Sequence, residues 1–263
     1  LIPYNFLITL PKIKKLRSAK KSAKTKAKKS KDKKLKKRLL LYDSKSFSPS
    51  FAIELFRSLN TKIQLDLFNE NDKSIAITSL NMGEGKSTVA ANLALSIADH
   101  GFKTILIDCD IRRGVSHELF DLQKSPGLSD YLCEAFQTNR SSIPTIPVQK
   151  TFNPNLWLVS CGNYVDNPQK YLSSTAMIAL KKRMRLQPFF LVFDSPPIGL
   201  ATDAALLSNL VSRYILVVKA GHTNIINLCK IIQKDFPVIE KQILGVVLNM
   251  GETPSNFGYY KYY

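Results

Sequence analysis

The chain has 263 residues, 44% of them hydrophobic and 10% aromatic, so it can bury a core and is not disordered throughout. Its 38 basic residues exceed its 20 acidic ones and give a formal net charge of +18. Sixteen of these basic residues, with the single acid Asp32, lie within residues 12–38, so the rest of the chain is nearly neutral. This distribution indicates a globular body with a basic arm and excludes a uniformly basic protein.

The first ten residues, Leu1 to Leu10, are mostly apolar and precede a lysine-rich stretch over residues 12–46. We interpret them as a short interfacial anchor or the end of a membrane helix. A secretory signal fits poorly, because its positive region should come first. The lysine-rich stretch repels itself, so we expect a disordered arm. No apolar run reaches 18 residues, so none spans a bilayer alone.

The pattern of an ordered domain begins at Ser48 and Pro49, which suit a helix N-cap and the first helical position. From Lys73 onward, short apolar runs alternate with helical stretches. The predicted strands cover residues 74–79, 103–108, 156–160, 189–194, 214–219 and 243–248. Nearly continuous apolar strands separated by helices predict a doubly wound α/β fold with one mostly parallel sheet. We assign residues 1–47 to the apolar start and basic arm, 48–255 to this domain and 256–263 to a tail.

A glycine-rich loop joins the first of these strands to a helical stretch that includes Val89. Residues 79–88 read SLNMGEGKST, and strand, loop and helix are the context in which such loops bind phosphate. The glycines let backbone amides turn toward phosphate oxygens, and the helix N-terminus adds partial positive charge. We expect Lys86 to reach the β- and γ-phosphates of a nucleotide and Ser87 to bind Mg²⁺, with Thr88 as a weaker candidate.

Two other predicted strands end in aspartate. Asp108 and Asp110 follow the strand at 103–108, and Asp194 closes the strand at 189–194. Parallel strands bring their carboxyl ends to one edge of the sheet, where doubly wound folds bind ligands. Carboxylates there suit Mg²⁺, which prefers oxygen ligands. Asp194 is the expected Walker B carboxylate, and the other two form either a shared metal shell or one ligand and one base.

Together these motifs resemble the bacterial tyrosine kinases that regulate capsular and exopolysaccharide synthesis. The resemblance covers residues 48–263 and rests on three motifs of the chain: GEGKST at 83–88, D-x-D-x-R at 108–112 and D-x-P-P at 194–197. It implies ATP-dependent transfer of a phosphoryl group to tyrosine, with ATP and Mg²⁺ as cofactors. The implied nucleotide-binding residues are Gly83, Glu84, Gly85, Lys86, Ser87, Thr88 and Asn249.

The resemblance also implies roles around the reacting phosphate. Lys86, Asp108 and Arg112 are the catalytic candidates, with Asp108 as the base that accepts the phenol proton. Ser87, Asp110 and Asp194 are the implied metal ligands, although Asp108 and Asp110 could exchange duties. Arg112 would either offset phosphate charge or brace the aspartates.

The C-terminus gathers four tyrosines in five residues, and in the resembling family such a tail is autophosphorylated. The implied phosphoacceptors are Tyr259, Tyr260, Tyr262 and Tyr263, unless this aromatic end simply packs onto the domain. Glu54 and Arg57 match an oligomerisation motif of the family, whose third position holds Asn60 here. A homo-oligomer, in the form of a ring, is therefore expected, while an ordinary i,i+3 ion pair is the alternative.

The family also implies a transmembrane activator of the polysaccharide co-polymerase type, a cognate tyrosine phosphatase and a cytoplasmic location at the inner face of the membrane. Residues 12–38 have three interpretations: contact with an anionic membrane surface, a solvated tail, or nonspecific nucleic-acid binding. Nucleic acid is the least favoured partner, because no aromatic residue interrupts this basic run.

Two other functions compete with the kinase. One is a P-loop ATPase switch of the partitioning or positioning type, whose loop would carry a signature lysine where this chain has Asn81. The other is a scaffold that uses nucleotide only to assemble polysaccharide machinery. Phosphorylation of the tail distinguishes both from a kinase.

Overall fold

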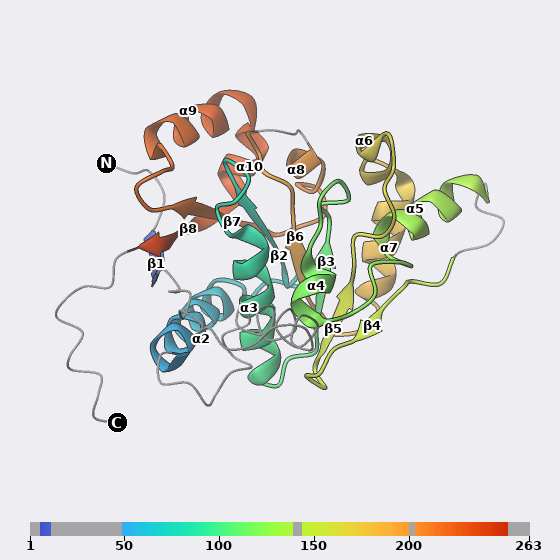
Figure 1. Cartoon of the computed structure of the whole chain (residues 1–263), viewed down its shortest axis with the longest axis horizontal. Helices are drawn as coiled ribbons and strands as arrows, with labels where there is room; N and C mark the ends of the chain where they lie inside the picture. The colour runs from blue at the N-terminus through green and yellow to red at the C-terminus, as the bar shows by residue number, and fades with distance from the viewer. Residues whose placement is uncertain (1–5, 12–48, 139–143, 200–202, 252–263) are drawn as a thin grey trace, which may run out of the picture.

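The computed structural model describes residues 6–11, 49–138, 144–199 and 203–251. Helices cover a central eight-stranded sheet whose strand order is β1-β8-β7-β2-β6-β3-β5-β4 (Figure 1). All paired strands are parallel except β4 and β5, which run antiparallel at one edge. This is the doubly wound, mostly parallel α/β fold that the sequence predicts.

The strands are β1 (Phe6–Pro11), β2 (Ser74–Ser79), β3 (Thr104–Asp108), β4 (Gln149–Lys150), β5 (Leu156–Val159), β6 (Phe190–Asp194), β7 (Arg213–Lys219) and β8 (Ile243–Gly251). The helices are α2 (Pro49–Asp66), α3 (Lys86–Asp99), α4 (Ser116–Phe120), α5 (Leu128–Gln137), α6 (Pro168–Leu172), α7 (Thr175–Met184), α8 (Asp203–Leu206), α9 (Ile225–Asp235) and α10 (Pro237–Gln242). Six of the strands coincide with the predicted ones. The differences lie at strand ends, of which the largest is the extension of β8 to Gly251. The predicted helix that follows Ser48 is confirmed as α2.

Each central strand is buried on both faces, because alternate side chains enter two separate hydrophobic clusters. In β7, Tyr214 and Leu216 belong to one cluster and Ile215 and Val217 to the other. Helices α2 and α3 contribute to the second cluster, while α5, α7 and α9 contribute to the first. This three-layer packing explains the nearly continuous apolar runs in the sequence.

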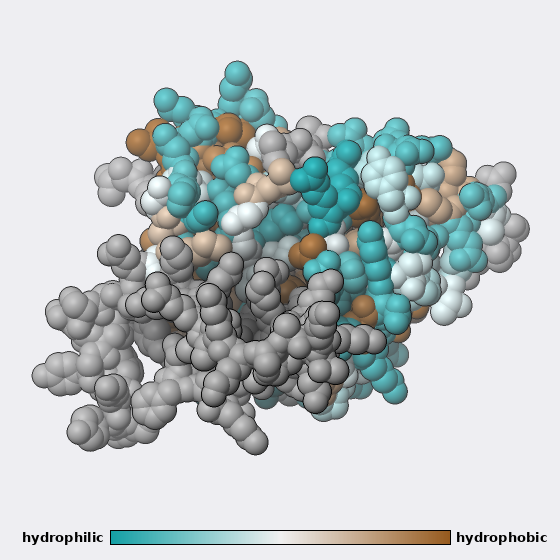
Figure 2. Space-filling model, in the orientation of Figure 1, coloured by the Kyte–Doolittle hydropathy of each residue, from teal (hydrophilic) through white to brown (hydrophobic). Residues whose placement is uncertain are grey.

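The coloured part of the surface in Figure 2 is largely hydrophilic, with hydrophobic atoms over α9. Ile226, in the first turn of α9, is 71% exposed. Within the described ranges, none of the helices combines the length and apolar character needed to cross a membrane.

The apolar start of the chain differs from its prediction. Residues 6–11 form the edge strand β1, which pairs in parallel with β8, instead of an interfacial anchor or a membrane helix. Leu7, Ile8 and Leu10 are buried in the cluster that contains α2, and the Lys62 ammonium of α2 hydrogen-bonds to the Leu7 carbonyl. The apolar pattern arises because this strand completes the core. The lysine-rich arm lies outside the described residues, and the domain boundaries drawn at residues 48 and 255 remain predictions.

The placement of β1 makes a stability prediction. Leu10→Ala removes a side chain that is 4% exposed and should lower the free energy of unfolding by about 2 kcal/mol, measured by denaturant titration. Leu186→Ala, at a side chain that is 80% exposed, is the control and should change little. If Leu10→Ala left stability unchanged and weakened binding to lipid vesicles, the anchor interpretation would be right.

Candidate active site

The phosphate loop lies between β2 and α3, at the carboxyl edge of the sheet. Gly83 and Gly85 have φ angles of +78° and +94°, in the left-handed region that side chains disfavour. Gly85 also lies against β8: a Cβ atom there would stand 2.1 Å from the Asn249 side-chain nitrogen. Both glycines are therefore required by backbone conformation, and Gly85 by space as well.

A buried carboxylate holds this loop from within. Glu84 is 3% exposed and accepts hydrogen bonds from the backbone and side-chain nitrogens of Asn81, at 3.1 and 3.3 Å, and from the Thr223 hydroxyl at 2.6 Å. The Asn249 side chain donates to the Glu84 carbonyl at 2.8 Å. Glu84 and Asn249 are both predicted to contact nucleotide. In the structure their side chains fix the loop. The sequence motifs do not indicate Thr223, whose hydroxyl contacts Glu84.

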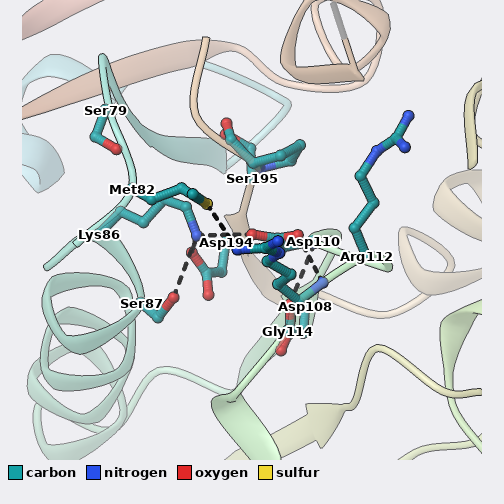
Figure 3. A network of polar contacts seen from close by, with 12 residues as sticks. Ser79, Met82, Lys86, Ser87, Asp108, Asp110, Arg112, Gly114, Asp194 and Ser195 are labelled. Atoms are coloured by element: carbon teal, nitrogen blue, oxygen red, sulfur yellow. Dashed lines mark hydrogen bonds and ion pairs between the residues drawn. The ribbon is translucent and has the colours of Figure 1, made fainter. Parts of the chain in front are cut away.

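Lys86, the first residue of α3, points into a group of carboxylates (Figure 3). Its ammonium donates to Asp110 Oδ2 at 3.0 Å and lies 3.9 Å from Asp194 Oδ1 and 3.5 Å from Ser87 Oγ. Burial opposes its positive charge, but the neighbouring carboxylates, with Asp194 first and then Asp110, outweigh burial and raise the pKa of Lys86. The structure therefore brings together Lys86, Ser87, Asp110 and Asp194, as the sequence predicts.

Asp108 and Asp194 occupy paired positions at the ends of β3 and β6, and both are fully buried. Burial and the nearby charge of Asp194 raise the pKa of Asp108 to about 8. Burial also raises the pKa of Asp194, although Lys86 partly offsets the effect. Two buried carboxyl groups on adjacent strands therefore favour a bound proton or another cation at this edge of the sheet.

These residues fit a magnesium ion that is bound together with a nucleotide. Asp194 Oδ1 is buried and has no hydrogen-bond partner, and it faces Lys86 on the side of Ser87. Within the described part of the chain, no three His, Cys, Asp or Glu side chains form a metal cage of their own. Magnesium in nucleotide sites typically takes only one or two carboxylates, together with phosphate oxygens and water. Asp194 with Asp110 and Ser87 provides such a donor set.

Arg112 points away from the aspartates (Figure 3). Its Nε donates to Asp203 Oδ2 at 2.9 Å, and this bond raises the pKa of Arg112. Asp203 begins α8 and is 1% exposed, while the Arg112 side chain is 44% exposed. The expectation that Arg112 braces Asp108 and Asp110 is therefore wrong, because Asp203 provides a buried carboxylate partner instead. The partial exposure of Arg112 leaves room for its other expected role, which is to offset phosphate charge.

Sequence reasoning missed two residues beside Asp108. The first is Ser116, whose backbone amide donates to Asp108 Oδ2 at 3.0 Å and whose hydroxyl donates to Asp194 Oδ2 at 3.3 Å. The second is Gly114, where a Cβ atom would lie 2.5 Å from both carboxylate oxygens of Asp108. Both follow the D-x-D-x-R motif within four residues, and that proximity is the signal that could have found them.

The remaining predicted residues lie apart from this site or outside the described residues. Glu54 and Arg57 form an exposed ion pair with each other on α2, whereas Asn60 is buried and donates to the Ser96 carbonyl at 3.4 Å. Thr88 is partly exposed in the first turn of α3. The phosphoacceptor candidates at 259–263 lie outside the described residues.

The fold and this site define a class of protein. The ParA family model, described as "NUBPL iron-transfer P-loop NTPase", matches residues 70–257. The chain belongs to this family of P-loop NTPases, and nucleotide binding follows from that membership. Iron transfer is named only in the description of the family model. In this chain the four cysteines are free thiols, and no two of them form a Cys-x-x-Cys pair.

Individual relatives narrow the class. Tyrosine-protein kinase CpsD of Streptococcus agalactiae serotype III (strain NEM316) is 32% identical over 223 residues, which cover 84% of this chain and 92% of the relative. Tyrosine-protein kinase YwqD of Bacillus subtilis (strain 168) is 32% identical over 210 residues, covering 80% and 85%. The crystal structure of the chimerical protein CapA2B2 superposes with a TM-score of 0.73 at 26% identity and covers 96% of both chains.

The chain belongs to the family of bacterial tyrosine-protein kinases, as its motifs predict. The alternative of a partitioning-type ATPase is not supported by these relatives. The structure agrees at Asn81, which stands where the signature lysine would be and hydrogen-bonds to Glu84 inside the loop.

The conformation of Gly85 makes a binding prediction. Gly85→Ala forces a side chain into a left-handed backbone and into Asn249, which should cost about 1–3 kcal/mol and weaken ADP binding about tenfold or more. The control is Gly101→Ala, because Gly101 has a similar φ of +88° with no atom within 4 Å of the added Cβ. That variant should lose stability but bind ADP normally in calorimetry. Equal ADP affinity in both variants would contradict the role of Gly85.

The raised pKa of Asp108 makes a second prediction. Because the folded protein binds this proton more tightly than the unfolded chain, stability without nucleotide should fall as the pH rises from about 4 to about 8. Asp108→Asn removes the titrating group and should flatten this slope in thermal melts across that range. Asp121→Asn, at an exposed acid after α4, should keep the slope. An unchanged slope in Asp108→Asn would contradict the assignment.

Proposed function

We propose that this kinase transfers the γ-phosphoryl group of ATP to Tyr259, Tyr260, Tyr262 and Tyr263 of a neighbouring copy, and that it regulates capsular or exopolysaccharide synthesis in this way. One observation carries the proposal: Lys86 and Asp194 Oδ1, which accepts no hydrogen bond, converge, 3.9 Å apart, beside a glycine loop that can hold phosphates. Membership in the tyrosine-kinase family and the tyrosine-rich C-terminus support the choice of acceptor.

Different groups at the site bind the phosphates and the Mg²⁺. Backbone amides of Gly83, Gly85 and their neighbours face phosphate oxygens, and Lys86 exchanges its bond with Asp110 for the β- and γ-phosphates. Ser87, Asp110 and Asp194 hold Mg²⁺, which when bound neutralises charge on the phosphate oxygens. With its bond to Lys86 released, Asp110 is free to serve as a ligand.

Asp108 is the proposed proton acceptor for the tyrosine hydroxyl. A tyrosine has a pKa of about 10, so a carboxylate with a raised pKa, once it has lost its own proton, takes the tyrosine proton more readily than an ordinary one. Asp108 is enclosed by Gly114 and Ser116, so the turn over residues 110–116 must open for an acceptor to reach it. Arg112, on the same turn, can move from Asp203 to the incoming phosphate charge.

The proposal also covers how the protein assembles and where it is located. The Glu54–Arg57 pair is exposed on α2 and available to a second copy, whereas the buried Asn60 is not, so the homo-oligomer or ring would use a shorter contact than the family motif. Further proposed partners are a transmembrane activator, a tyrosine phosphatase and an anionic membrane surface that contacts residues 12–38. The proposed location is the cytoplasmic face of the membrane.

Intact-mass measurement after incubation with ATP and Mg²⁺ tests the phosphoryl transfer. We expect added phosphates that map to the tyrosines at 259–263, either with the chain alone or with the cytoplasmic tail of an activator. Lys86→Met, which removes the ammonium that contacts the phosphates, should show none.

The same experiment has a clear opposing result. ATP turnover without any tail phosphate, even with activator present, would favour a nucleotide-dependent scaffold. Phosphate added equally to Lys86→Met would point to a contaminating kinase and contradict the proposed site.

A further inference from the structure

Ser116 connects the two buried carboxylates that end β3 and β6. It is itself fully buried, and its amide and hydroxyl donate to Oδ2 of Asp108 and Oδ2 of Asp194, at 3.0 and 3.3 Å. These carboxylates belong to adjacent strands and occupy paired positions. One residue outside every motif of the sequence thus contacts both a proposed base and a proposed metal ligand.

The chain reaches this position through a tight turn. The Arg113 amide donates to the carbonyl and to Oδ1 of Asp110, each at 3.0 Å, so the turn folds back on the aspartate motif. Gly114 then passes directly over Asp108, where any side chain would collide with the carboxylate. The turn therefore brings Ser116 to both carboxylates, and on Asp194 it contacts the oxygen other than the one nearest Lys86.

The hydroxyl of Ser116 acts on one oxygen of the Asp194 carboxylate, while Lys86 and Ser87 act on this carboxylate as well. The terminal torsion of an aspartate is broad, so its two oxygens can exchange places unless a partner distinguishes them. Here Oδ2 accepts from Ser116, while Oδ1 has no hydrogen-bond partner and faces Lys86 at 3.9 Å. The oxygen presented to the nucleotide side is thus the one that Ser116 does not occupy.

We propose that Ser116 is a positioning residue, whose hydroxyl orients Asp194 so that Oδ1 is offered to the Mg²⁺ of a bound nucleotide and whose amide holds Asp108 beside it. The inference rests on the proposed nucleotide and magnesium site. Residues that orient a metal ligand in this way influence metal affinity without touching the metal. A serine that merely fills space in the core would not affect how magnesium and nucleotide binding are coupled.

The test measures that coupling directly, without relying on phosphoryl transfer. The full chain is titrated calorimetrically with ADP, once in EDTA and once with saturating Mg²⁺. Ser116→Ala should bind ADP normally in EDTA. The factor by which Mg²⁺ increases ADP affinity should be about tenfold smaller in this variant than in the unaltered protein. Ser116→Thr keeps the hydroxyl and should restore the gain.

Ser74→Ala is the matched control. Ser74 is an equally buried serine at the opposite end of β2, where its hydroxyl contacts the Leu210 carbonyl at 3.5 Å. Its loss should leave the magnesium-dependent gain unchanged. Should Ser116→Thr fail to fold by circular dichroism, Ser116→Cys replaces it, and the weaker thiol donor should give an intermediate gain.

Different failures have different meanings. Full magnesium coupling in Ser116→Ala, or an equal loss in Ser74→Ala, would overturn the positioning role alone. A loss of ADP affinity in EDTA as large as the loss with Mg²⁺ would overturn it too, because the effect would then be on the fold. No gain from Mg²⁺ in the unaltered protein would overturn the proposed metal site, and this inference with it.

Discussion

The structure is organised around a deficit of positive charge. Asp108, Asp110 and Asp194 meet at the carboxyl edge of the sheet, and Lys86 is the cation that faces them. Burying a carboxylate without a compensating partner is costly, and the raised pKa values of Asp108 and Asp194 express that cost. A magnesium–nucleotide complex brings a cation to the carboxylates and phosphates to the lysine. The site is thus a charge arrangement that such a ligand would complete.

The parallel sheet makes this arrangement possible. Ile77, Asp194 and Asp108 are register partners across β2, β6 and β3, so three successive strand ends meet at one level. The loop after β2 is held by residues that follow or end β7 and β8, which lie on the opposite flank of β2 from β6 and β3. Asn249 at the end of β8 and Thr223 after β7 both contact Glu84. Elements distant in sequence therefore set the geometry of a short phosphate loop.

The sequence was sufficient to predict most of this framework. The apolar runs predicted six strands because central strands of a parallel sheet are buried on both faces. The glycine loop and the terminal aspartates predicted the site because ligands gather where parallel strands end. Both signals are local, so a single sequence carries them.

The misses depended on tertiary contacts. The apolar run at 6–11 is compatible both with a strand of the sheet and with contact to a membrane. Only its pairing with β8 in the structure distinguishes the two. Bracing of the nearby aspartates is one of two roles that the sequence suggests for Arg112, whereas in the structure Asp203, far along the chain, holds it. Ser116 carries no pattern of its own, since its importance comes from facing two strand ends together.

The pairing of β1 with β8 has a consequence for how the protein is made. Phe6 is a register partner of Val246, so β1 is synthesised well before β8, the strand with which it pairs. Until β8 is made, Leu7, Ile8 and Leu10 lack the strand beside which they are buried, and such exposed apolar surface is prone to aggregation. The same late strand carries Asn249, which holds the phosphate loop. A growing chain therefore gains the contact between Asn249 and the phosphate loop only after β8 has been made, although the loop precedes β8 in the sequence.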